Sequence, residues 1–190
     1  MTETISAGPR TGQPEARVVS GAPEALWFLG TLARMKLEGH QTGGRFALWE
    51  GVLPRGAAPP LHSHPQDETF YVLEGELTAW VLEPELVAAG SDPAEWAGSH
   101  GRICAAGAVV FAPAGIPHTF RVESDTARML FLSTPSGIED YVRALAEPAQ
   151  WPWLQPPPDG PRVPPERIAA VEDRLGIVRH GPPPPTAETD

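Results

Sequence analysis

Short apolar runs, each closed by turn-forming residues, follow one another from about residue 25 to residue 134 of the 190-residue chain. Examples are the stretches ETFYVLEGELTAWVLE, RICAAGAVVFAPAG and ARMLFLSTP. Runs of this length, with no long helical pattern between them, are typical of antiparallel β-proteins. The sequence therefore predicts an all-β fold, either a sandwich or a barrel.

Two parts of the chain lack this pattern of short apolar runs. Segment 82–102 is rich in small and acidic residues, which predicts a surface loop between two strands. After residue 135, apolar residues recur at helical spacing in two stretches, the first capped by Ser136 and ended by Pro148, the second followed by Gly176. Between these two predicted helices, segment 150–162 is rich in proline and predicts an extended arm over the β-structure.

The length of the chain and its apolar content favour one domain with extensions. We expect a flexible N-terminal segment over 1–22, a β-domain over 23–135, C-terminal helices with the proline-rich arm over 136–180, and a disordered tail over 181–190.

Charge and cysteine content exclude several classes of function. Acidic residues outnumber basic ones 24 to 14, and the basic residues are scattered, so neither nucleic acid nor an anionic membrane is expected as a partner. The N-terminus has no signal-peptide pattern, and no apolar run reaches about 20 residues, which predicts a cytoplasmic protein. Cys104 is the only cysteine, so we expect a packed, inert thiol and no internal disulfide.

A pair of histidines just before an apolar run suggests metal chemistry. On one strand His62 and His64 would point to the same face, with their α-carbons about 6.5 Å apart. If the strand continued in register past Pro65, Glu68 would join them and Asp67 would face away. By itself the pattern is weak evidence for a metal, and a polar strand edge with satisfied histidines is the more common explanation.

A third histidine strengthens the metal interpretation. His118 follows a Pro-Ala-Gly turn and begins another apolar run, which can meet the first one across a closed barrel. Three imidazoles and one carboxylate would hold one divalent transition metal ion and leave positions open for substrate. Such a ligand set suits Fe, Mn, Ni, Co, Cu and Zn. The other histidines, His40, His100 and His180, lie in polar segments and predict solvated side chains without function.

At these residues the sequence resembles the cupin superfamily. The first cupin motif, G(X)5HXH(X)3-4E(X)6G, is matched by Gly56, His62, His64, Glu68 and Gly75. The second motif, G(X)5PXG(X)2H(X)3N, is matched by Gly107, Pro113, Gly115 and His118, and departs only at Val122, where asparagine is usual. The resemblance covers residues from about 25 to 134. It implies a small antiparallel β-barrel, or jelly roll, with a short helical C-terminal extension.

The resemblance also implies a site and an activity. His62, His64, Glu68 and His118 would bind the metal inside the barrel, and barrels of this superfamily commonly pair as homodimers. The C-terminal helical portion is similar to that of single-domain, quercetinase-like cupin dioxygenases. This similarity suggests a metal-dependent dioxygenase that acts with O2 on a small aromatic or enolic, flavonol-like substrate.

Further expectations concern the surroundings of the metal. Glu68 is also a candidate general base, because a carboxylate whose pKa is raised by an apolar cavity could take a proton from a substrate hydroxyl. A non-oxidative cyclase or isomerase of polyketide-type compounds and a non-catalytic binding cupin are the alternatives. Several apolar side chains could line a substrate pocket, although core packing would explain them equally well: Phe70, Val72, Phe111, Phe120, Val122 and Met129.

Overall fold

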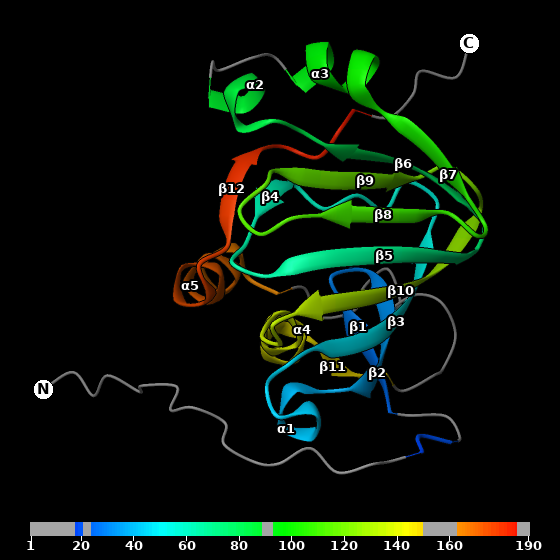
Figure 1. The fold of residues 1–190 in the computed structure, drawn as a ribbon, viewed down its shortest axis with the longest axis vertical. Helices are drawn as coiled ribbons and strands as arrows, with labels where there is room; N and C mark the ends of the chain where they lie inside the picture. The colour runs from blue at the N-terminus through cyan, green and yellow to red at the C-terminus, as the bar shows by residue number, and fades with distance from the viewer. Residues whose placement is uncertain (1–17, 21–23, 89–92, 150–162, 186–190) are drawn as a thin grey trace, which may run out of the picture.

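Two antiparallel sheets face each other in the computed structural model of the chain (Figure 1). The structure describes residues 18–20, 24–88, 93–149 and 163–185. One sheet has seven strands in the order β11-β1-β2-β3-β10-β5-β8, and the other has five in the order β12-β4-β9-β6-β7. The expected all-β, jelly-roll-like fold is therefore confirmed.

The strand bounds follow the apolar runs of the sequence. The seven-stranded sheet consists of β1 (Ala25–Phe28), β2 (Thr31–Leu37), β3 (Ala47–Pro54), β5 (Asp67–Glu74), β8 (Val109–Ala112), β10 (Thr126–Thr134) and β11 (Glu147–Pro148). The five-stranded sheet consists of β4 (Leu61–Ser63), β6 (Glu76–Val81), β7 (Arg102–Ala105), β9 (His118–Val122) and β12 (Val178–Gly181). The helices are α1 (Gly39–Thr42), α2 (Pro84–Ala88), α3 (Pro93–His100), α4 (Ile138–Leu145) and α5 (Pro165–Leu175).

The hydrophobic core lies between the two sheets and is built by strand alternation. On β10, Ala127, Met129 and Phe131 are buried, while the residues between them are more exposed. The β5–β6 turn depends on Gly75, whose φ is +82° and where a Cβ atom would collide with the carbonyl oxygen of Thr126. Alternation thus directs one set of side chains from each sheet into a shared interior.

The C-terminal part of the chain adds strands to both sheets as well as helices. β11 pairs with β1, and β12 pairs with β4, so this part is more than the helical extension that the sequence predicts.

Helix α4 buries its apolar face as expected, but its N-cap is Gly137 rather than Ser136. There the backbone N–H of Gly137 donates to the carboxylate of Glu139, which ties the N-cap residue to the first turn of the helix. The predicted arm over 150–162 lies outside the described residues, as does nearly all of the predicted flexible segment 1–22.

The prediction of a surface loop over 82–102 is wrong, because this insertion contains α2 and α3. Trp96 on α3 is only 4% exposed and packs edge-on against Trp80 of β6, with ring centroids 6.1 Å apart. The indole N–H of Trp80 donates to the carbonyl of Ala97 at 3.0 Å. A single tryptophan therefore anchors a segment whose composition otherwise indicates a loop.

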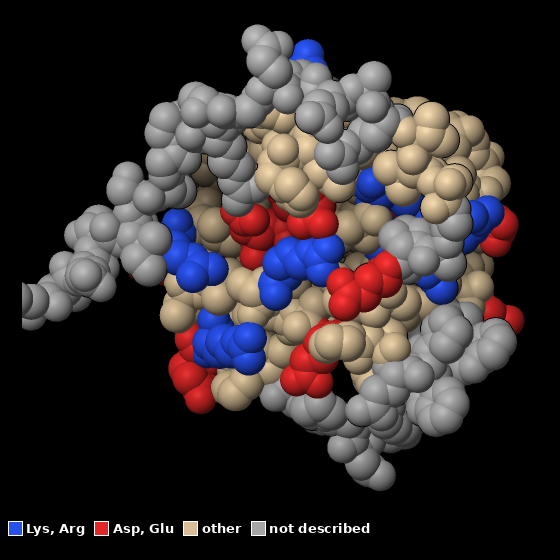
Figure 2. All heavy atoms as spheres, turned by 90° about the horizontal axis from the view of Figure 1, so that it is seen from below, with Lys and Arg blue, Asp and Glu red and all other residues tan. Residues whose placement is uncertain are grey.

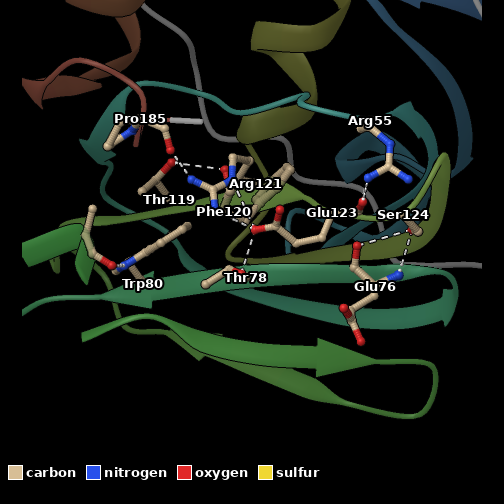
Figure 3. A network of polar contacts seen from close by, with 11 residues as sticks. Arg55, Glu76, Thr78, Trp80, Thr119, Phe120, Arg121, Glu123, Ser124 and Pro185 are labelled. Carbon is tan, nitrogen blue, oxygen red and sulfur yellow. Dashed lines mark hydrogen bonds and ion pairs between the residues drawn. The ribbon is translucent and has the colours of Figure 1, made fainter. Parts of the chain in front are cut away.

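Polar contacts secure the end of the chain on the outer face of the five-stranded sheet (Figure 3). Arg121 of β9 stacks over the Trp80 ring at 5.5 Å, pairs with Glu123 at 2.7 Å, and donates to the carbonyl of Pro185. The chain that leaves β12 is thereby tied to β9, so β12 is held at both ends.

The outer face of the seven-stranded sheet carries charges of both signs. Acidic and basic side chains are interspersed on the lower side of the molecule (Figure 2), and Lys36 of β2 pairs with Glu50 of β3 at 2.8 Å. Within the described residues, no helix has the length and apolar character needed to cross a membrane.

We predict that Trp96→Ala lowers the free energy of unfolding by about 3 kcal/mol, because it opens a cavity between α3 and β6. Ile103→Ala is the control, because Ile103 is 74% exposed and should change stability by less than about 0.5 kcal/mol. Urea unfolding measures both values. Equal effects of the two variants would contradict the packing of α3 described here.

Candidate metal centre

Four side chains that carry nitrogen or carboxylate ligand atoms meet inside the barrel. His62 on β4 lies opposite His118 on β9 in the five-stranded sheet, and Glu68 reaches them from β5 of the other sheet. His64 follows directly after β4. One ligand atom from each residue lies within 4.8 Å of the other three. The structure therefore brings together all four residues that the sequence singled out as metal ligands.

The route by which Glu68 reaches the histidines differs from the predicted one. β4 ends at Ser63 and β5 begins at Asp67 in the other sheet, so no single strand runs through Pro65. Glu68 faces the histidines because the chain crosses between the sheets. Asp67 does point elsewhere, since its carboxylate accepts the backbone N–H of Ala114 at 2.8 Å. The prediction that Glu68 joins the histidines while Asp67 faces away is therefore confirmed. The single continuous strand on which this prediction was based is wrong.

The hydrogen bonds of two histidines leave their inner nitrogens available for a cation. His62 and His118 each place Nδ1 2.8 Å from a backbone carbonyl, that of Pro60 and that of Ile116. A neutral imidazole that donates from Nδ1 carries a lone pair on Nε2. Metal-binding histidines commonly have their other ring nitrogen fixed in this way.

Glu68 lies where these lone pairs converge. Its Oε2 is 3.0 Å from Nε2 of His64 and 3.3 Å from Nε2 of His118. Because His118 donates from Nδ1, its Nε2 lone pair faces a carboxylate oxygen, and a proton or a metal cation must lie between two such groups. Nδ1 of His64 is buried without a partner among the described residues.

The spacing of the four residues also fits an ion. Ligands at about 2.1 Å from one ion are at most about 4.2 Å apart, so the widest pairs need to close by only a few tenths of an ångström. The geometry and hydrogen bonding of the four side chains therefore fit a divalent transition metal.

The pKa values of this centre follow from burial and from its internal contacts. Burial and, to a smaller extent, the nearby His118 together lower the pKa of His62 to about 4, so His62 is neutral at pH 7 and ready to bind a cation. Burial by itself would raise the pKa of Glu68, but its close contacts with His118 and His64 outweigh burial and hold this pKa below its ordinary value. The raised Glu68 pKa expected from an apolar cavity is therefore not found, because the carboxylate has polar neighbours.

A cavity of about 230 Å³ opens beside the centre, and His62 and Glu68 form part of its wall. Aromatic rings make up much of the remaining lining: Phe28, Trp49, Phe70, Phe120 and Phe131. Trp49 stacks on Phe131 with ring centroids 3.9 Å apart, and Phe70 meets Phe131 edge-on at 5.3 Å. The ligand cluster thus borders a mainly apolar space.

Of the six predicted pocket residues, two line the cavity, three are buried in the core, and one is exposed. Phe70 and Phe120 line the cavity. Val72, Val122 and Met129 are fully buried core residues and are not part of the cavity wall.

Phe111 was misplaced by the prediction. It pairs with Thr69 and is 55% exposed on the outer face, because its neighbours Val110 and Ala112 take the inward positions of β8.

Sequence reasoning missed a polar part of the cavity wall. Tyr141 of α4, Glu172 of α5 and Arg179 of β12 all line the same cavity. The helical spacing in α5 identifies only its apolar positions. The sequence around Glu172 and Arg179 contains no pattern that would predict a place in a cavity wall. Only the pairing of β12 with β4 reveals their location.

The other histidines lie outside the four-residue cluster. His40 on α1 and His100 on α3 are exposed, as expected. His180 is also largely exposed, but its Nε2 is 2.8 Å from the hydroxyl oxygen of Ser63, so it links β12 to β4 and is not purely solvated. Cys104 is buried, and burial raises the pKa of its thiol, consistent with a packed cysteine.

Comparisons with known proteins agree with this architecture. A family model described as a cupin domain matches residues 49–92, a range that includes His62, His64 and Glu68. Quercetin 2,3-dioxygenase of Bacillus subtilis (strain 168) is 26% identical over 130 residues, which cover 68% of this chain and 34% of that enzyme. The chain thus spans about a third of the length of this relative.

Solved structures with a similar fold include KdgF from a Halomonas species and oxalate decarboxylase from Bacillus subtilis. KdgF is 15% identical, with a TM-score of 0.45, over 58% of this chain and 84% of its own. Oxalate decarboxylase, for which Mn(II) centres are described, is 17% identical, with a TM-score of 0.46, over 63% of this chain and 31% of its own.

The cupin-domain model matches residues 49–92, the part of the chain that supplies three of the four clustered side chains. The two facing antiparallel sheets are consistent with a cupin-type domain, and its His/His/Glu/His cluster can hold a metal ion.

We predict that His62→Ala abolishes stoichiometric metal binding, because it removes one of three imidazole ligands. Asp67→Ala is the matched control: it should keep the metal and lose only the hydrogen bond to Ala114. Metal content after reconstitution of tag-free protein, measured by elemental analysis, distinguishes the two variants. Equal metal loss in both would show that the cluster described here is not the binding site.

Proposed function

We propose that this protein is a metal-dependent oxidoreductase of the dioxygenase type, acting on a small, mainly apolar aromatic or enolic compound. The observation that carries the proposal is the position of the ligand cluster on the wall of an aromatic-lined cavity, where a bound molecule can reach it. Ligand sites of this kind commonly combine an apolar lining with a few polar groups.

The ligand set supports redox chemistry. Three imidazoles and one carboxylate, when they hold an ion such as Fe, Mn, Ni, Co or Cu, leave positions at which an enolate or phenolate oxygen and O2 can bind and react. The same ligands also suit Zn, which would favour Lewis-acid chemistry instead. The similarity to quercetin 2,3-dioxygenase favours the oxidative reaction.

Residues of the chain would orient the substrate and move its proton. The rings of Phe70, Phe120 and Phe131 offer flat apolar contacts to an aromatic substrate. Both close contacts of Glu68 use Oε2, so Oε1 can accept the proton of a substrate hydroxyl. Because the pKa of Glu68 lies below its ordinary value, this transfer requires a bound metal that makes the hydroxyl more acidic. Glu68 would thus act as general base beside its role as a ligand.

Two further expectations stay proposals. We infer that the protein forms a homodimer through the edge of the seven-stranded sheet, where Val109 and Phe111 of β8 are exposed. A cytoplasmic location likewise stays a proposal.

We predict that the metal-loaded protein consumes O2 when supplied with a flavonol or an enolic ketone, measured with an oxygen electrode over a panel of such compounds. Glu68→Gln should lower the rate by at least about a hundredfold, because it removes a ligand and the proposed base. Asp67→Asn is the matched control, because it makes the same acid-to-amide change at a neighbouring residue outside the ligand cluster. It should change the rate little.

Other outcomes of this experiment favour other functions. Turnover of a panel compound without O2 uptake would overturn the oxidative proposal in favour of a cyclase or isomerase. Tight binding without turnover would favour a non-catalytic binding cupin.

A further inference from the structure

The C-terminal part of the chain contributes a polar cluster to the wall of the cavity. The hydroxyl of Tyr141 donates to Oε1 of Glu172 at 2.9 Å. Arg179 donates to the same carboxylate through Nε at 2.8 Å and through Nη2 at 2.7 Å. These three residues, the polar cluster, come from α4, α5 and β12, which lie outside the region that carries the cupin motifs.

Strand pairing places Arg179 beside the metal centre. β12 lies next to β4, with α5 close by at the left of Figure 1, and Arg179 is directly opposite His62 in the register of the two strands. Directly opposed residues of antiparallel strands project from the same face, with Cβ atoms about 5 Å apart. Both side chains border the same cavity. A molecule bound at the metal would therefore extend past Arg179.

Glu172 holds the Arg179 guanidinium in a defined orientation. Glu172 is only 8% exposed, and both of its oxygens are used by Arg179 and Tyr141. Bidentate pairs of this type fix the plane of the guanidinium. Nη1 of Arg179 has no hydrogen-bond partner among the described residues, and 48% of the side chain is exposed. Arg179 therefore keeps donors for another group after its contact with Glu172 is made.

The charges around the cavity favour an anion once a metal is bound. The carboxylates of Glu68 and Glu172 balance a divalent ion, and the guanidinium of Arg179 then leaves one net positive charge in a mainly apolar space. This half-exposed guanidinium at the cavity wall can pair with one negative charge on a bound ligand through charge-assisted hydrogen bonds.

We propose that Arg179 is a specificity-determining residue, and that it binds an anionic oxygen group, such as a carboxylate, on an aromatic substrate whose body lies against the phenylalanine rings. Glu172 and Tyr141 are positioning residues that orient Arg179. This inference rests on the proposed function, because it assigns the substrate class of the same site.

The test compares two ligands of equal shape and different charge. Tag-free, metal-loaded protein is titrated with 2-naphthoate and with 2-naphthamide in a calorimeter. The wild-type protein should bind the carboxylate at least about tenfold more tightly than the amide, as expected for a charge-assisted hydrogen bond. Arg179→Met should reduce this ratio to about one at unchanged metal content, and Arg179→Lys should restore part of it.

Arg174→Met is the matched control, because Arg174 is an exposed arginine in the last turn of α5. It should leave the preference for the carboxylate unchanged. If Arg179→Met fails to fold because Glu172 loses its partner, the double variant Glu172→Gln/Arg179→Met removes both charges and gives the same comparison.

The outcomes separate this inference from the proposed function. A wild-type protein that binds metal but does not prefer naphthoate, or binds neither probe, contradicts the inference and leaves the metal-dependent activity standing. A preference that persists in Arg179→Met also contradicts it, because the carboxylate would then bind elsewhere, for example at the metal. Failure to bind metal at all would overturn the proposed function itself, and elemental analysis shows that independently.

Discussion

The structure of the site depends on the meeting of Glu68 with His64 and His118 between the two sheets. Three imidazoles and a carboxylate occupy an interior that is otherwise apolar, and polar groups placed there are costly unless they are paired. The protein meets this cost in two ways. Backbone carbonyls bind the outer nitrogens of His62 and His118, while the inner nitrogens converge on one point with Glu68. A cation at this point satisfies groups that would otherwise be held together only by protons.

The barrel explains how such a centre can be held in place. His62 and His118 are opposite one another on adjacent strands, so their separation is set by the sheet itself. Glu68 comes from the other sheet and depends on the packing of the core between them. Rigid strands on two sides therefore define the site, and the aromatic residues around it leave a space in which a ligand can reach it.

Sequence reasoning identified the residues of this cluster because their spacing carries a chemical requirement. Histidines and an acid at these intervals, with a second histidine segment far along the chain, have no simple explanation as a polar loop. The same reasoning could not show that β4 and β5 belong to different sheets, because the chain crosses between them over only three residues. It also placed Phe111 in the pocket. Apolar composition cannot tell which face of an edge strand is buried, and the register with β5 decides this.

The polar cluster formed by Tyr141, Glu172 and Arg179 could not be predicted from the sequence, for a different reason. Each of its residues is ordinary in its local context. Arg179 is brought to the cavity by the pairing of β12 with β4, a strand more than a hundred residues earlier, while Tyr141 comes from α4 and Glu172 from α5. The fold thus combines two facing sheets with a candidate metal centre, which motifs in the sequence predict, and a C-terminal cavity wall that depends on long-range contacts. In this account the first part supplies reactivity, and the second part helps to choose the substrate.

X-ray absorption spectroscopy of the metal-loaded protein tests the central claim most directly, because it reports which atoms surround the ion. From the four clustered side chains we expect three imidazole nitrogens and at least one oxygen at about 2.0–2.2 Å from the metal. Multiple scattering from imidazole rings should be visible in the wild-type spectrum and weaker in His118→Ala. A first shell made only of oxygen, or one with sulfur from Cys104, would contradict the proposed centre.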